Sequence, residues 1–254
     1  MWNNIGFDLC QSFINCQLRP GETNERTSRH LPSLAPAITV SRMTGSGGRA
    51  IASTLAEYLQ ARVPVDCHWT VFDRSLIEKT LEDHHLPKRM AEYMPENHKA
   101  VVTDVVEELF GLHPSSWTLV RQTSDTILRL ARLGHVILVG RGANVVTSKL
   151  DNVFHVRLVG SLERRTERVQ KVYGLDRSQA LDFIRQEDTG RKRYLQHHFG
   201  EDIDDPLLYH LVINTDRVPY DEAARMIGRA VIERFALERS QRLDTSPASV
   251  PLMG

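Results

Sequence analysis

The 254-residue sequence has no long apolar run: no stretch approaches the roughly 20 residues that a membrane-crossing helix needs. Its first residues, MWNNIGFDLCQSF, lack the basic segment followed by an apolar segment that is typical of a secretory signal. Net charge is also lacking, because 32 Lys and Arg residues balance 32 Asp and Glu residues. No overall field attracts nucleic acid or an anionic membrane, so we expect neither as a partner, and any basic site must be local.

Cysteine is scarce as well. The three cysteines, Cys10, Cys16 and Cys67, are an odd set, and their spacing is typical of neither a metal site nor a disulfide framework. We therefore expect reduced thiols and a cytoplasmic protein. The sequence indicates no metal-ligating residue.

Two terminal segments differ in composition from the rest of the chain. Residues 1–36 include RPGETNERTSRHLPSLAP, whose Pro, Ser, Thr and charged residues predict a disordered tail, and residues 239–254 predict a second loose tail. Apolar residues among the first 16 fit a short docking helix, but the sequence does not indicate what it docks on. A protein partner or a homo-oligomer formed through this tail stays open.

Between the tails, strand and helix patterns alternate. Short apolar runs predict strands at 37–40, within 63–72, and at 135–140, 153–159 and 210–214. Helices are predicted at 48–62, 73–82, 98–111, 115–133, after Ser161, at 176–196 and at 220–237. Strands separated by helices imply an α/β fold with a parallel sheet and helices on both of its faces.

The first strand leads into a helix through a glycine-rich turn, SRMTGSGGRA, at 41–50. Such a turn directs free amides and the positive end of the helix dipole at one point, which suits a phosphate. Standard phosphate loops add a lysine and a Ser or Thr hydroxyl, but Gly48 and Ala50 stand in those places here. A ligand-free turn is an equal alternative for the isolated motif. Its position at the carboxyl end of the first strand favours a ligand.

Two arginine clusters favour a ligand further. Arg141 directly follows the buried strand at 135–140, again at a carboxyl end, although alone it fits a surface loop. Residues 162–194 hold nine Lys and Arg residues against six acids, and Arg185, Asp188 and Arg191 share one side of the predicted helix. This segment is either a solvated charged face or a mobile lid whose arginines close over phosphates.

Together, AITVSRMTGSGGRAIASTLAEYL, VFDRSLIE, VILVGRGANVV, FHVRLVGSLERRTERV, RQEDTGRKRY and LVINTDRVPYDEAARMI resemble the cytidylate kinase-like branch of the P-loop nucleoside monophosphate kinases, over about residues 37–238. The resemblance implies a P-loop kinase fold with a five-stranded parallel sheet flanked by helices. It also implies a helical NMP-binding insertion at about 73–133 and a lid at about 162–198. ATP with Mg²⁺ would be the donor, and a nucleoside monophosphate such as CMP or dCMP the acceptor.

The resemblance also implies the site residues. Those expected to bind the ATP phosphates are Thr44, Gly45, Ser46, Gly47, Gly48, Arg49 and Ala50. Those expected to bind the acceptor are Asp73, Arg141 and Asp188, and those expected to act in catalysis are Arg191, Arg185, Asp188 and Arg49.

Three departures from the family pattern bear on activity. The loop has no lysine, so Arg49 is the nearby cation, and Ala50 lacks the magnesium-binding hydroxyl. Ser41 or Thr44 can replace that hydroxyl only if the loop geometry differs. Gly142 stands where the family's G-R-D signature has its aspartate, which weakens the prediction of a cytosine nucleotide.

Three functions stay open at this point. The first is the nucleotide kinase that the resemblance implies. The second is a nucleotide-binding regulatory protein on a kinase scaffold with little or no turnover, which Ala50 and Gly142 favour. The third is a non-kinase α/β protein whose N-terminal tail recruits a partner.

Overall fold

The computed structural model describes residues 35–63, 65, 67–73 and 118–244, together with Ser12, Phe13 and Cys16; side chains at 118, 119 and 236–244 are not described. Five strands form one sheet in the order β2-β3-β1-β4-β5, and all neighbours are parallel. The strands are β1 (Ala37–Arg42), β2 (Thr70–Phe72), β3 (Val136–Val139), β4 (Val153–Val159) and β5 (Leu211–Asn214). This confirms the predicted five-stranded parallel sheet.

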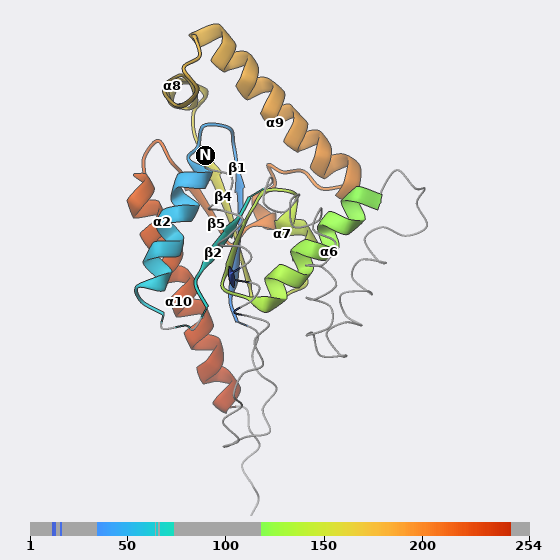
Figure 1. The fold of residues 1–254 in the computed structure, drawn as a ribbon, viewed down its shortest axis with the longest axis vertical. Coiled ribbons are helices and arrows are strands. Elements are labelled where there is room, and N and C mark those ends of the chain that lie inside the picture. Colours follow the sequence, from blue (N-terminus) through green and yellow to red (C-terminus); the bar gives the residue numbers. More distant parts are fainter. Residues whose placement is uncertain are drawn as a thin grey trace, which may run out of the picture.

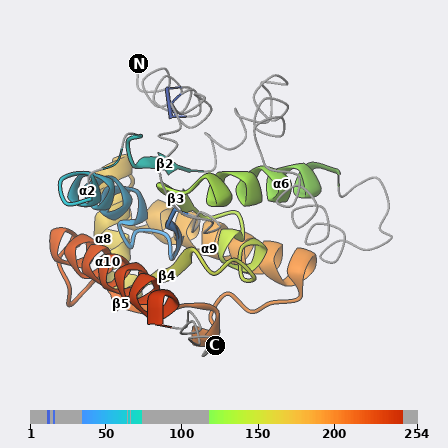
Figure 2. The same ribbon diagram turned by 90° about the horizontal axis from the view of Figure 1, so that it is seen from below.

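The helices are α2 (Gly48–Gln60), α6 (Thr118–Leu133), α7 (Ala143–Val146), α8 (Leu162–Tyr173), α9 (Arg177–Phe199) and α10 (Tyr220–Asp244), with a 3₁₀ turn, η2, at Pro206–Leu208. They form a layer on each face of the sheet, and a third group, α8 and α9, lies beyond the carboxyl ends of the strands (Figure 1). Helices α2 and α10 cover one face, while α6 and α7 lie on the other (Figures 1 and 2). Helix α9 crosses beyond the carboxyl ends of the strands (Figure 1).

Alternation along the strands divides the core into two clusters. Ile38 of β1 is fully buried against α2 and α10, where it meets Ile51. Val136 of β3 faces the opposite layer and packs with Ile127 of α6. Because both faces are covered, β3 is apolar throughout and reads as a continuous hydrophobic run, whereas β1 and β4 also bury the polar residues Thr39, His155 and Arg157.

Capping residues set the ends of three helices, and two of these residues, Ser161 and Gly134, were predicted from the sequence. The Ser161 hydroxyl accepts a hydrogen bond from the Arg164 N–H at 3.4 Å and starts α8, and Gly134 ends α6 with a φ of +73°. Asp176 starts α9 through a reciprocal pair of hydrogen bonds with Gln179. The Ser161 and Gly134 predictions are confirmed.

Some elements differ in length from the prediction. Strand β1 continues past Val40 because Ser41 and Arg42 pair with β4, opposite Arg157 and Leu158. Helix α10 continues past its predicted end at residue 237 to Asp244. The predicted helices at 98–111 and nearly all of 73–82 lie outside the described residues, as does most of the expected insertion at 73–133.

The structure contradicts the expectation of unpaired thiols. Cys16 and Cys67 form a disulfide, although 51 positions separate them in the sequence. Ser12, Phe13 and Cys16 are helical, and Phe13 is only 2% exposed because its ring packs edge-on against Phe72 at the end of β2. These residues therefore dock on the core of the same chain. The expected reducing compartment rested on unpaired cysteines, and this pair removes that support.

Two further findings apply to the part of the chain that is described. None of its helices is long and apolar enough to span a membrane. None of its His, Cys, Asp and Glu side chains gather in groups of three or more that would suit a metal ion.

Candidate phosphate-transfer site

The turn between β1 and α2 can be built only with glycine at two positions. Gly45 and Gly47 have φ values of +80° and +83°. A Cβ atom on Gly45 would lie 2.6 Å from the Arg165 carbonyl oxygen, and one on Gly47 would lie 2.2 Å from the Tyr220 ring. Gly47 caps α2 without a side-chain hydrogen bond, so the amides of the first helical turn remain available to an anion.

The hydroxyl groups of the turn are engaged within the protein. Ser46 is buried, and its Oγ donates to the Met43 carbonyl oxygen at 2.8 Å. Thr44 Oγ1 donates to an Asp188 carboxylate oxygen at 2.7 Å, and Ser41 Oγ accepts from Arg157 at 2.9 Å. Both hydroxyls considered as substitutes for the one missing at Ala50 therefore already have protein partners.

Asp188 brings α9 onto the loop. Its Oδ1 accepts from the Thr44 backbone N–H at 2.8 Å, and its Oδ2 accepts from Arg165 at 2.6 Å. Arg165 is buried, and it also donates to the Thr44 carbonyl oxygen at 3.1 Å. The backbone N–H of Thr44 is therefore bound by Asp188 of α9, and its carbonyl oxygen is bound by Arg165 of α8.

Arg191 lies one turn further along α9 and reaches the same loop residue. One guanidinium nitrogen donates to Thr44 Oγ1 at 2.5 Å and to Asp188 at 3.0 Å. The other donates to Glu187 at 2.8 Å. The Arg191 guanidinium is therefore held against the loop by fixed partners, as a phosphate-binding group needs to be.

Two arginines predicted to act in catalysis make no hydrogen bond or ion pair with Thr44 or Asp188, although Arg49 lines the loop cavity. The Arg185 side chain is 70% exposed and lies 3.6 Å from Asp182. The Arg49 side chain is 78% exposed and pairs with Asp73. Asp73 itself lies at the end of β2 and lines the cavity above the loop.

Arg141 occupies a strained turn after β3. It has a φ of +58° and lies between Gly140 and Gly142, whose φ values are +88° and +68°. Backbone strain of this kind in a non-glycine residue is often found at functional sites. Arg141 lines a cavity of about 230 Å³ that also borders Tyr194 of α9. The structure therefore places Arg141 at the carboxyl end of β3, beside α9.

The space beside Gly142 is filled by the last turn of α9. A Cβ atom on Gly142 would lie 2.8 Å from the Phe199 ring and 3.2 Å from Leu195. The aspartate of the family signature would not fit at this position without moving α9. The departure at Gly142 is therefore coupled to the packing of α9.

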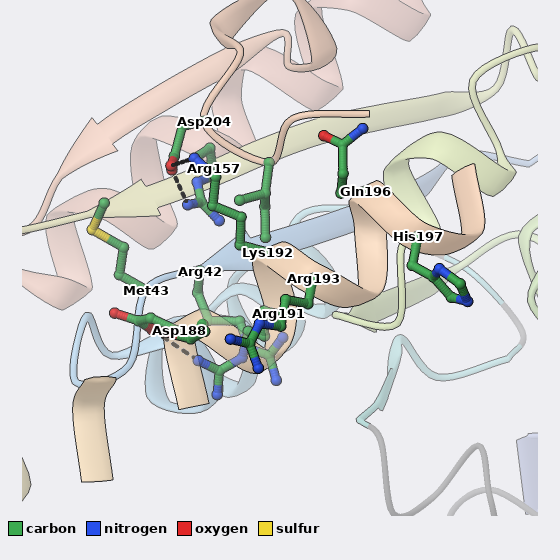
Figure 3. A pocket seen from close by; sticks show the side chains of 12 residues that line it. Arg42, Met43, Arg157, Asp188, Arg191, Lys192, Arg193, Gln196, His197 and Asp204 are labelled. Carbon is green, nitrogen blue, oxygen red and sulfur yellow. Dashed lines mark hydrogen bonds and ion pairs between the residues drawn. The ribbon is translucent and has the colours of Figure 1, made fainter. Parts of the chain in front are cut away.

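Two larger cavities adjoin the loop, with volumes of about 760 Å³ and about 930 Å³, both within the range of small-molecule sites. The loop cavity includes the loop glycines, Asp73, Glu187 and Tyr220. The second cavity lies along α9, where Asp204 sits beside Arg157 and Asp188 beside Arg191 (Figure 3).

Two arginines of this region, Arg42 and Arg157, were not identified from the sequence, and Arg165 was counted only as a member of the charged segment 162–194. Arg157 is 4% exposed on β4 and donates to Asp204 at 2.9 Å. Arg42 ends β1 and lines both large cavities and the Arg141 cavity. Arg42 and Arg157 lie near the carboxyl ends of β1 and β4. The same position, after a predicted strand, led to the prediction of Arg141, so it could also have indicated these two arginines.

Comparisons with known proteins agree with this geometry. The model of the cytidylate kinase-like family matches residues 37–217. A cytidylate kinase of Pyrococcus horikoshii is 24% identical over 188 residues, covering 74% of this chain and 83% of that protein. The crystal structure of an uncharacterized protein from Eubacterium ventriosum superposes with a TM-score of 0.59 at 22% identity, covering 78% of this chain and 98% of that one.

A shikimate kinase structure from Bacteroides thetaiotaomicron also matches, with a TM-score of 0.37 at 15% identity over 80% of this chain and 98% of that chain. The family match spans the sheet, the glycine loop and the arginines of α8 and α9 described above. The chain therefore belongs to the cytidylate kinase-like family.

Proposed function

We propose that this protein transfers a phosphoryl group from ATP to a nucleoside monophosphate of the CMP type. The observation that carries the proposal is the contact of Arg191 with Thr44, which brings a lid arginine onto a glycine loop at the start of a helix. Phosphoryl transfer needs two nucleotides in line and positive charge on the transferring group, and it needs little covalent chemistry from the protein.

The ATP phosphates would lie in the loop cavity. The amides of Gly45–Arg49 and the positive end of α2 would bind the β-phosphate. Arg191 would neutralise the transferring group, and Asp188 would orient Arg191 through their 3.0 Å contact. Closure of α9 over the loop would exclude water, which limits hydrolysis of ATP.

The acceptor phosphate would lie in the Arg141 cavity, whose volume of about 230 Å³ suits the phosphate end of a nucleotide. The cytidylate kinase of Pyrococcus horikoshii supports a CMP-like acceptor. Gly142 leaves no room for an acidic residue, so the base would be recognised by other groups of the chain.

Mg²⁺ would accompany the ATP phosphates and neutralise part of their charge. It is commonly held by one or two carboxylates, water and the phosphates themselves. The loop cavity offers two carboxylates, Asp73 and Glu187, so its residues fit the ion. These two side chains would hold it in place of the hydroxyl missing at Ala50.

A coupled assay with ATP, Mg²⁺ and a panel of monophosphates tests the proposal. We expect turnover with CMP or dCMP, and a loss on the order of 10²–10³ in kcat in Arg191→Ala. Arg141→Ala should chiefly raise the KM of the acceptor. Arg225→Ala is the matched control, because Arg225 pairs with Asp221 on the exposed surface of α10. Equal activity in all three variants would rule out the assigned site.

The second candidate is a nucleotide-binding protein without turnover. It is favoured by the Asp188 carboxylate, which occupies the Thr44 amide where a phosphate could bind. Nucleotide binding by calorimetry, combined with no product in the coupled assay, would support this candidate over the kinase.

A further inference from the structure

A cation and a glycine have exchanged places in the phosphate loop. The standard loop, G-x-x-x-x-G-K, has its first glycine six residues before its lysine. In this chain Gly48 stands at the lysine position, and Arg42 stands six residues earlier, where the first glycine is expected. The loop thus keeps one glycine and one cation at these two positions in reversed order.

The structure shows that the two replacements depend on each other. The Arg42 side chain passes over Gly48, because a Cβ atom on Gly48 would lie 2.9 Å from Arg42 Cγ. Its guanidinium ends beside Gly140, where a Cβ atom would lie 2.2 Å from an Arg42 nitrogen. Glycine at 48 and 140 therefore makes room for Arg42, and a lysine at 48 would collide with it.

The Arg42 guanidinium is half-buried, and it makes no hydrogen bond or ion pair with any residue that the structure describes. Burial, followed by the charge of Arg191, lowers the pKa of Arg42 to about 10, while Glu187 and Asp73 oppose that change. Arg42 is thus still charged at neutral pH. The guanidinium nitrogens of Arg42 are not among the buried polar atoms without a partner, so they face the cavities and can donate to an anionic ligand.

Arg42 also has the right surroundings for a polyanion. Arg42 and Arg191 line the loop cavity, the cavity along α9 and the Arg141 cavity. In Figure 3 their side chains project into the same region of the cavity along α9. Arg49, which the sequence suggested for the lysine's place, is mostly exposed and pairs with Asp73.

We propose that Arg42 performs the role of the missing loop lysine and binds the terminal phosphates of a nucleoside triphosphate. The guanidinium reaches the phosphates from the end of β1, whereas a standard lysine reaches them from the start of the helix. This assignment deepens the proposed kinase function and rests on it for the identity of the ligand, a nucleoside triphosphate. The binding of a polyphosphate by Arg42 can be measured without any turnover.

Calorimetric titration with inorganic tripolyphosphate is the primary test. We expect Arg42→Met to weaken binding by at least about tenfold, since hydrogen bonds to charged groups are worth that much. Arg42→Lys should retain part of the affinity, because it keeps the charge but loses the two-pronged donor geometry. Arg62→Met is the matched control, because Arg62 follows the carboxyl-terminal end of α2, at the far end of that helix from the loop.

A double variant separates the proposed role from a structural one. Arg42→Gly should lose tripolyphosphate affinity, and adding Gly48→Lys should restore it by re-creating the standard order. In the coupled assay, Arg42→Met should lower kcat by about 10²–10³. Its melting temperature should change little, because Arg42 makes no hydrogen bond or ion pair with the described residues that the variant would lose.

Unchanged tripolyphosphate affinity in Arg42→Met would overturn the inference, as would a loss in Arg49→Met alone or a wild-type protein that binds no tripolyphosphate. Failure of the proposed function gives a different pattern. Arg42-dependent binding of tripolyphosphate without turnover on any monophosphate would contradict the kinase and support the role of Arg42.

Discussion

Asp188 on α9 accepts hydrogen bonds from both the backbone N–H and the hydroxyl of Thr44, at 2.8 and 2.7 Å. A single carboxylate thus ties α9 to the glycine loop between β1 and α2. It also partners the buried Arg165, at 2.6 Å. The position of α9 over the loop therefore depends on one carboxylate that also forms ion pairs with Arg165 and Arg191.

Asp188→Asn should loosen the lid and destabilise the protein. The amide removes the negative charge opposite Arg165 and weakens a charge-assisted hydrogen bond, so we expect a loss of about 1–3 kcal/mol in the free energy of unfolding. Urea denaturation measures this loss. Hydrogen exchange at the Thr44 amide should become faster in the same variant, because its acceptor is weaker.

Asp182→Asn is the matched control for Asp188. Asp182 lies on the same helix with a largely exposed side chain, 3.6 Å from the equally exposed Arg185. Exposed pairs of this kind contribute little, so the control should change stability by less than about 0.5 kcal/mol. Equal effects of the two variants would show that Asp188 does not hold the lid.

Gly142→Ala should destabilise the protein more than Gly174→Ala. Both glycines have a φ of +68°, so the backbone strain of the substitution is the same. A Cβ atom at Gly142 would meet Phe199 at 2.8 Å, whereas nothing lies within 4 Å of one at Gly174. We expect overpacking to add about 1–3 kcal/mol at Gly142. Thermal unfolding of the two variants measures the difference, and equal melting temperatures would contradict the packing against α9.

Stability should fall as the pH falls from about 6.5 towards 4. Burial, followed by the charges of His210 and Arg234, lowers the pKa of His155 to about 4, compared with about 6.5 for an unfolded histidine. Between these values the unfolded chain binds a proton that the folded protein does not, so the free energy of unfolding decreases by up to about 1.4 kcal/mol per pH unit. Urea denaturation at pH 7.5, 6 and 5 measures the slope.

His155→Gln should make this slope shallower. The histidine Nδ1 lies 2.9 Å from Thr39 Oγ1, a contact that an amide can also make. The pKa of the neighbouring His210 is also lowered, chiefly by burial, so part of the slope should remain. A slope identical to that of the wild type would show that His155 does not titrate as described.

Cys16→Ser should lower the free energy of unfolding by about 4 kcal/mol, the value that the chain-entropy model assigns to a loop of this length. The disulfide spans 51 positions and joins the helical residues around Phe13 to the segment before β2. Urea denaturation with and without a reductant measures the effect. Reductant should bring the wild type to the level of Cys16→Ser and leave the variant unchanged. Insensitivity of the wild type to reductant would contradict the pairing.

Local signals in the sequence determined much of the fold. The apolar run at 135–140 predicted β3, Ser161 predicted the start of α8, and Gly134 predicted the end of α6. Each depends on interactions within a few residues, such as a capping hydroxyl or a glycine with positive φ. The glycine loop was recognisable for the same reason, because its φ values and close contacts need glycine wherever the chain folds.

The partners of the site residues could not be predicted in this way. Thr44 and Asp188 are 144 positions apart, and either could have met other groups of opposite polarity. The separation of Arg185 from the loop arises from the rotation of α9, which its packing decides: Ile184 is buried, and its neighbour Arg185 is exposed.

The sequence by itself determined the α/β order, the sheet and the loop that can bind a phosphate, because these follow from periodicity and from the conformational range of glycine. Only the tertiary structure decided where the two arginines beside that loop point. Arg42 and Arg49 stand at the two ends of the same turn, and because both are arginines the sequence does not distinguish them. Packing across Gly48 and Gly140 directs Arg42 inward, while Arg49 pairs with Asp73 at the surface.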